Sequence, residues 1–127
     1  GKRGWEEFVQ EVADVYNELP PEERVIAGIW ADWYGPASAI DHLGPQYGLP
    51  HAVSGHLTYH LWGPGYSWDV MIIVSRSEYP IKNFYIECEA KKTVEHPYVY
   101  VGSQKVTVCR NPTLSADKIW LNLKRFY

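Results

Sequence analysis

The sequence predicts an α/β fold, a three-layer Rossmann-like sandwich with a mostly parallel sheet of about five strands and flanking helices. One pattern in the sequence supports this prediction. Amphipathic segments with helical spacing alternate along the chain with short apolar segments of strand length. Such alternation is typical of parallel sheets covered by helices. The 127 residues suit one domain of ordinary size, so we expect residues 1–127 to form a single soluble α/β domain.

The sequence of the first half of the chain predicts three helices and two strands. Apolar residues recur at spacings of three and four over residues 5–19, which predicts an amphipathic helix closed by two prolines. The apolar run at 25–30 predicts a strand covered on both faces. Residues 36–43 predict a helix ended by a Gly-Pro pair. A short strand around 51–53 and a short helix over 57–62 are expected to follow.

The second half predicts the centre of the sheet and its remaining strands. Residues 70–74 (VMIIV) are the most hydrophobic segment, which favours a central strand. A helical turn is expected at 81–85. Alternating patterns at 84–90 and 105–109 predict two more strands. Ser115 can cap a last helix, whose expected core-facing residues are Ile119, Trp120 and Leu123.

Composition excludes some classes of function. The net charge of −3 and the absence of a basic stripe argue against a nucleic-acid partner. No apolar run has the length of a membrane span, and no signal-peptide pattern is present. Ten tyrosines and six tryptophans indicate either rigid packing or an aromatic surface for a sugar, a peptide or the membrane interface.

The two cysteines, Cys88 and Cys109, leave their redox state open. Neither lies in a CxxC or other metal-binding pattern, which disfavours zinc. Both fall in predicted strands, where a buried free thiol is the commonest state. A disulfide would instead require their Cβ atoms to lie within about 4.5 Å of each other.

Residues 32–65 are the most distinctive segment, because glycines, prolines, histidines and aromatic residues are concentrated there. In open α/β sheets, ligands usually bind beyond the carboxyl ends of the strands. Three polar clusters follow predicted strands, and the 32–65 segment supplies the first two: Asp32-Trp33-Tyr34, Ser54-Gly55-His56 and Ser75-Arg76. We therefore expect a ligand-binding edge there.

Two catalytic or metal-binding interpretations of this segment are weak. His56 and His60 have the i, i+4 spacing of metal ligands, but Leu57 replaces the glutamate of an HExxH motif, so hydrogen-bonded structural histidines are favoured. Asp32 and Asp41 could act as paired carboxylates, although Asp41 is equally suited to bind backbone or a neighbouring tyrosine. Neither GxGxxG nor GxSxG is present. We expect no catalytic residue, no metal and no cofactor in this chain.

Four stretches carry a family resemblance: GWEEFVQEVADVYNELPPEER, WYGPASAIDHLGPQYGLPHAVSGHLTYHLWGPG, DVMIIV and VTVCR. They resemble the soluble C-terminal region of bacterial family 39 glycosyltransferases, membrane proteins related to dolichyl-phosphate-mannose–protein mannosyltransferases. The pattern YGxAxAIDxxGPxYGLPxAxSGHxxYxLWGPG is its longest part. Trp33 and Leu57 stand where relatives often have asparagine, so a ligand that used those amides would be recognised differently here.

The resemblance implies that the chain is the C-terminal piece of a larger cell-membrane protein that transfers a sugar from a polyprenyl-phosphate donor. The domain would face the periplasm or cell exterior, and the parent's catalytic carboxylates belong to a region absent here. The expected role is recognition of acceptor or donor. The expected ligand-binding residues are Asp32, Trp33, Tyr34, Tyr47, Ser54, His56, Tyr59, His60 and Trp62. The alternative is a non-catalytic docking domain for the membrane bundle or a partner subunit.

Overall fold

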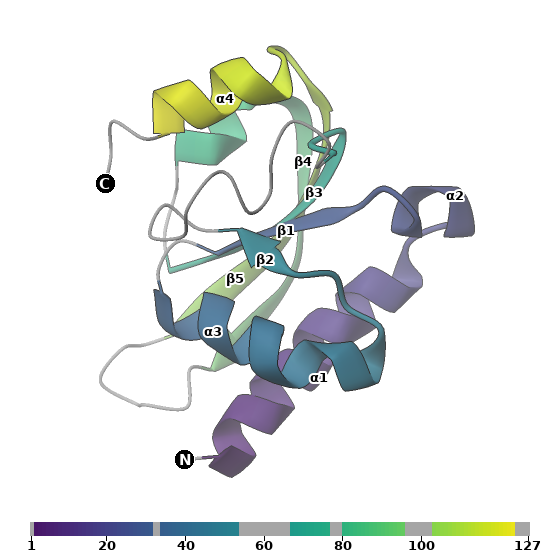
Figure 1. Cartoon of the computed structure of the whole chain (residues 1–127), viewed down its shortest axis with the longest axis vertical. Helices are drawn as coiled ribbons and strands as arrows, with labels where there is room; N and C mark the ends of the chain where they lie inside the picture. The colour runs from purple at the N-terminus through teal and green to yellow at the C-terminus, as the bar shows by residue number, and fades with distance from the viewer. Residues whose placement is uncertain (1, 32–33, 54–66, 77–79, 96–102, 124–127) are drawn as a thin grey trace.

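A computed structural model of the chain describes residues 2–31, 34–53, 67–76, 80–95 and 103–123 (Figure 1). Their strands form one sheet in the order β2-β1-β3-β5-β4. The strands comprise β1 (Gly28–Ala31), β2 (Ala52–Val53), β3 (Val70–Ser75), β4 (Tyr85–Glu95) and β5 (Ser103–Pro112). β3 lies at the centre and is buried along its whole length, as its apolar sequence predicts.

The helices begin and end close to the predicted positions. α1 (Lys2–Glu18) ends before the two prolines, and α3 (Tyr34–Leu43) ends at the Gly-Pro pair that starts the 3₁₀ helix η1 (Gly44–Tyr47). The predicted helical turn is the 3₁₀ helix η3 (Pro80–Phe84). In α4 (Ala116–Leu123), the side chain of Ser115 accepts a hydrogen bond from the Lys118 amide (3.4 Å), which confirms the predicted cap.

The first predicted strand is shorter than its apolar run. β1 contains only four residues, all of them buried. The short helix α2 (Pro21–Arg24) precedes it, and Val25 and Ile26 are 84% and 40% exposed. An apolar run does not distinguish buried from exposed positions, because it has no inside–outside pattern.

The expectation of a mostly parallel, three-layer Rossmann-like sandwich is wrong, because the sheet is mixed. β1 runs parallel to β2 and to β3, whereas β5 is antiparallel to both β3 and β4. Only seven residues separate β4 from β5, too few for the crossover of a dozen or more residues that parallel strands need. The two longest strands therefore pair as neighbours in an antiparallel arrangement.

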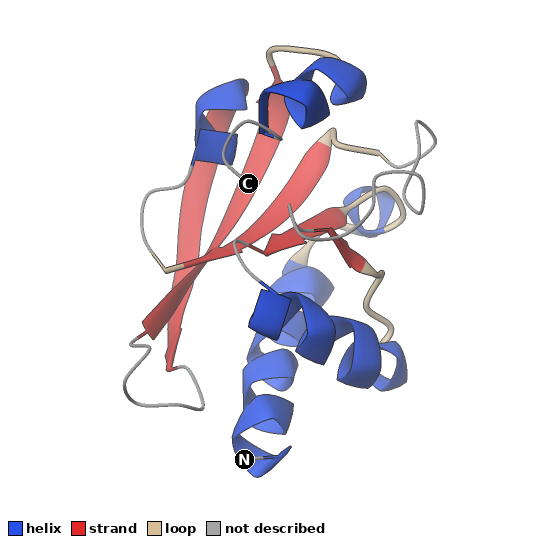
Figure 2. Ribbon diagram, turned by 60° about the vertical axis from the view of Figure 1, so that its left-hand side comes forward, coloured by secondary structure: helices blue, strands red, loops and turns tan. Residues whose placement is uncertain are grey.

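Helices lie on both faces of the sheet (Figure 2), and apolar side chains pack on each face. On one face, α1 and α3 cover Ile29, Ile72 and Val108. On the other, η3 and α4 cover Trp30, Ile73 and Cys109, and the predicted core residues Ile119 and Trp120 belong to this cluster. The side chain of Leu123 lies outside the described part.

Two polar contacts fasten distant segments to this framework. The hydroxyl of Tyr85 donates a buried hydrogen bond to the carbonyl of Trp68 (2.5 Å). Arg110 on β5 binds Glu23 in α2 through two hydrogen bonds of 2.7 and 2.8 Å. The described helices include none with the length and apolar character to cross a membrane.

Candidate functional site

The parallel strands β1, β2 and β3 end at one edge of the sheet. The register pairs Trp30 with Val53 and Ala31 with Val74, so β1, β2 and β3 all end on the same side. Residues 32–33 follow β1 directly, and residues 54–66 follow β2 directly. Both predicted segments therefore start at neighbouring points of this carboxyl edge.

Most of the predicted site residues lie outside the described part of the structure. These are Asp32, Trp33, Ser54, His56, Tyr59, His60 and Trp62, and the expected helix over 57–62 lies there too. Tyr34 is the first residue of α3, but its side chain is also outside the description. Tyr47 is the one predicted ligand-binding residue whose side chain is described.

Asp41 has a structural role. Its Oδ1 accepts a hydrogen bond of 2.7 Å from the backbone amide of Ala52, the first residue of β2. The Nδ1 of His51 lies 3.5 Å from the same oxygen. Asp41 therefore holds the start of edge strand β2 against α3, in agreement with the backbone-binding interpretation of this carboxylate.

The clearest candidate site in the described structure is a polar groove between α1 and η1. Its volume is about 490 Å³, and it is lined by Gln10, Ala13, Asp14, Asn17, Gln46 and Tyr47. The four α1 residues follow a spacing of three and four, which places them on one side of the helix. Gln46 and Tyr47 come from η1 and close the other wall. We call this feature the α1–η1 groove.

The sequence GPQYG fixes Tyr47 in the groove wall. A Cβ on Gly44 would lie 3.1 Å from the Cβ of Leu49, so the chain approaches closely here. Gly48 has a φ of 78°, a left-handed conformation that favours glycine, and ends η1. The half-buried Tyr47 ring packs against the core cluster, and its hydroxyl accepts a 2.9 Å hydrogen bond from Gln10 Nε2.

The groove is lined by hydrogen-bonding side chains and by one aromatic residue, Tyr47. Three side-chain amides and a carboxylate supply both donors and acceptors. The Asp14 carboxylate lies 3.7 Å from Lys92 Nζ, but it is 68% exposed, so this ion pair is weak and leaves the oxygens accessible. Such a surface suits a ligand with many hydroxyl groups. The hydroxyl groups need hydrogen-bond donors and acceptors, and an apolar face of the ligand can pack on the aromatic ring.

The α1–η1 groove is separate from the carboxyl edge. α3 starts at the end of β1 and runs back, and η1 follows it before β2 begins. η1, which carries Tyr47, consequently lies at the far end of α3 from the carboxyl end of β1. The structure does not bring Tyr47 to the edge where the other predicted residues begin.

Sequence reasoning missed the groove residues contributed by α1. Gln10, Asp14 and Asn17 have helical spacing and are all exposed, so the pattern alone indicated an ordinary solvated helix face. The available signal was the pair of amide residues Gln10 and Asn17, two helical turns apart in a helix with several acidic residues. Their proximity to Tyr47 depends on the tertiary fold.

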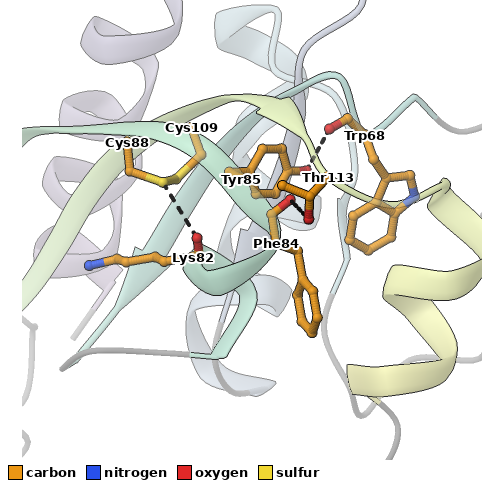
Figure 3. Close-up of a disulfide and its surroundings, with 7 residues drawn as sticks. All are labelled: Trp68, Lys82, Phe84, Tyr85, Cys88, Cys109 and Thr113. Carbon is orange, nitrogen blue, oxygen red and sulfur yellow. Dashed lines mark hydrogen bonds between the residues drawn. A yellow bond between two sulfur atoms is a disulfide. The ribbon is translucent and has the colours of Figure 1, made fainter.

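The two cysteines, whose redox state the sequence leaves open, are joined in a disulfide. Cys88 on β4 and Cys109 on β5 are directly opposite in the antiparallel ladder, with Cα atoms 4.0 Å apart (Figure 3). Cys109 is fully buried, whereas Cys88 is exposed.

No group of three or more metal-ligating side chains occurs among the residues that the structure describes. No family model, no curated protein and no solved structure matches the chain. The functional assignment therefore depends on the chemistry of the groove, the disulfide and the sequence resemblance.

Proposed function

We propose that this chain is a non-catalytic recognition domain that binds a sugar in the α1–η1 groove. It serves as an accessory extracytoplasmic domain of a membrane glycosyltransferase with a polyprenyl-phosphate sugar donor. The observation that carries the proposal is the groove itself, which Gln10, Asn17 and Gln46 line together with Tyr47. Amides and a carboxylate beside an aromatic ring match the alternating polar and apolar surfaces of a sugar.

The position of the ring supports binding without large rearrangement. Three features fix Tyr47. Its ring packs against the core, its hydroxyl accepts a hydrogen bond from Gln10, and the left-handed Gly48 ends the 3₁₀ helix directly after it. A fixed ring loses little conformational freedom when a ligand packs on it, which favours affinity. The open shape of the groove suits part of a longer glycan better than a fully enclosed small molecule.

The disulfide supports the proposed location. Disulfides persist in oxidising compartments outside the cytosol and are rare in cytosolic proteins. The bond between Cys88 and Cys109 therefore agrees with a domain that faces the periplasm or the cell exterior.

The test is an NMR titration of the ¹⁵N-labelled chain. Neutral oligosaccharides are added in one series and a short-chain polyprenyl-phosphate sugar in another. We expect the side-chain NH₂ signals of Gln10, Asn17 and Gln46 to shift in a saturable manner. The side-chain amide of Asn83, which lies in η3 on the other face of the sheet, should not shift. Saturation by both ligand types indicates a sugar site, and saturation by the polyprenyl-phosphate sugar alone indicates a donor site. No shift at the three groove amides would contradict the proposal.

A second candidate function is docking onto the membrane-embedded part of the parent protein or a partner subunit. The exposed apolar residues Val25 and Ile26 favour it, because large apolar side chains at 84% and 40% exposure often mark contact sites. Pro21 and Val25 also line a shallow hollow of about 340 Å³ against α1. In the full-length protein, Val25→Ser with Ile26→Ser would reduce assembly and leave sugar binding unchanged if docking is the function. Loss of sugar binding with normal assembly would contradict it.

A further inference from the structure

The disulfide lies in the wall of an open hollow on the face of the sheet that carries η3. This hollow has a volume of about 390 Å³, and its lining includes Cys88, Lys82, Lys105 and Thr107. It is separate from the α1–η1 groove, which lies on the opposite face. We propose that this disulfide is open to thiol exchange on the folded protein, and that the Sγ of Cys88 is the atom that an incoming thiolate attacks.

The two sulfur-bearing residues differ in accessibility. Cys88 is exposed on edge strand β4, whereas Cys109 on β5 has no exposed surface. A thiolate must approach one sulfur along the axis of the S–S bond, so the exposed residue is the accessible target. Figure 3 shows the disulfide between the two strands, with Lys82 of η3 beside it.

The charge around the hollow favours an anionic attacker. Lys82 comes from η3 and Lys105 from β5, so two lysines from different elements line one hollow. Cationic side chains near a disulfide attract thiolates and stabilise the thiolates that exchange produces.

The surrounding structure can lose the bond without separating the strands. Ladder pairs lie on both sides of the disulfide, Glu87 with Arg110 and Glu89 with Val108. The carbonyl oxygen of Lys82 lies 3.9 Å from Cys88 Sγ. A disulfide sulfur has no proton to donate, but the free Cys88 thiol would have one, so this carbonyl becomes an acceptor after reduction.

The leaving sulfur also has a polar neighbour. Thr107 lies two residues before Cys109 on the same strand, and its buried Oγ1 has no hydrogen-bond partner among the residues that the structure describes. Burial disfavours the negative charge that develops on the Cys109 sulfur, and a nearby hydroxyl donor would offset part of that cost.

The exchange balances with a dithiol as reductant. Its thiolate attacks Cys88 Sγ, a new S–S bond forms to Cys88, and the bond to Cys109 breaks. The electron pair leaves on Cys109 Sγ, which takes a proton from water. The second thiol of the reductant then attacks its own sulfur in the mixed disulfide and releases Cys88 as a thiol. Two electrons pass to the protein, and the dithiol becomes a disulfide.

The test is native-state reduction of the intact chain. Glutathione, a monothiol, is added without denaturant, free thiols are alkylated, and the adduct is located by peptide mass spectrometry while circular dichroism follows the fold. We expect a mixed disulfide on Cys88 and a free thiol at Cys109 in a chain that remains folded. An adduct mainly on Cys109, or reduction that occurs only at the rate of global unfolding, would overturn the proposal.

Charge variants test the role of the hollow. Lys82→Gln and Lys105→Gln should each slow the reaction about two- to threefold at low salt, and about 1 M salt should abolish the difference. Lys92→Gln is the matched control, because Lys92 forms an ion pair with Asp14 of α1, the helix that covers the opposite face of the sheet. Thr107→Val should slow release of Cys109. Equal slowing by all three lysine variants would overturn the proposed role of the hollow.

Discussion

Arg110 on β5 and Glu23 in α2 form a two-point ion pair between residues 87 positions apart in the sequence. Both side chains are about one-fifth to one-quarter exposed. The hydrogen bonds from Arg110 lower the pKa of Glu23 from its ordinary value of 4.5, and the positive charge of Arg110 adds to this effect against the opposing effect of burial. The same hydrogen bonds raise the pKa of Arg110, assisted by the negative charges of Glu23, Glu87 and Glu89.

This ion pair predicts an acid-dependent loss of stability. The pKa of Glu23 is lower in the folded chain, so its contribution is fully present above the unfolded pKa near 4.5 and is lost as the pH falls through the folded value. Glu23→Gln should cost about 1–2 kcal/mol at pH 7, with the difference from wild type shrinking below about pH 4.5. Urea denaturation from pH 3 to 7 measures this, and a difference that is constant with pH would contradict it.

Asp41 should stabilise the start of β2. Asp41→Ala removes the acceptor of the Ala52 amide, and we expect a loss of about 1–2 kcal/mol and faster hydrogen exchange at that amide. Asp41→Asn retains an acceptor oxygen and should restore most of the protection. Unchanged exchange in the alanine variant would show that the contact contributes little.

Tyr85 should contribute through its hydroxyl as well as its ring. Tyr85→Phe keeps the buried ring but removes the donor to the Trp68 carbonyl, so we expect a loss of about 1–2 kcal/mol in the free energy of unfolding. Chemical denaturation measures this value. A variant as stable as wild type would mean that water replaces the lost donor.

Gly48 should be required for its backbone conformation. An added Cβ meets no atom within 4 Å, so Gly48→Ala costs only the left-handed φ, about 1 kcal/mol. Gly48→Asn should cost less, because asparagine tolerates this conformation. Equal losses for alanine and asparagine, measured by thermal denaturation, would indicate a different cause.

The sequence was sufficient to predict most elements because their signals are local. The spacing of Phe8, Val12 and Val15 identified α1, and the run at 70–74 identified the central strand β3. Strand direction was not predictable in the same way. β5 inserts between β3 and β4, and this order depends on pairings between distant segments.

The candidate site was predictable only in part. Tyr47 was predicted to bind a ligand because it is an aromatic residue of the distinctive segment 32–65. Gln10 and Asn17 line the same groove from α1, Gln10 being 37 residues before Tyr47, and no local pattern links them to Tyr47. The cysteine pairing depended similarly on the register of β4 and β5, which brings Cys88 and Cys109 opposite each other.

The most direct test of the proposed sugar site is the affinity of Tyr47→Ala. The ligand is the oligosaccharide or polyprenyl-phosphate sugar that shifts the groove amides, and isothermal titration calorimetry compares wild type, Tyr47→Ala and the control Asn83→Ala. We predict about tenfold weaker binding for Tyr47→Ala, equivalent to about 1.4 kcal/mol, and unchanged binding for Asn83→Ala. Equal affinities for a folded Tyr47→Ala variant and wild type would contradict the proposed site.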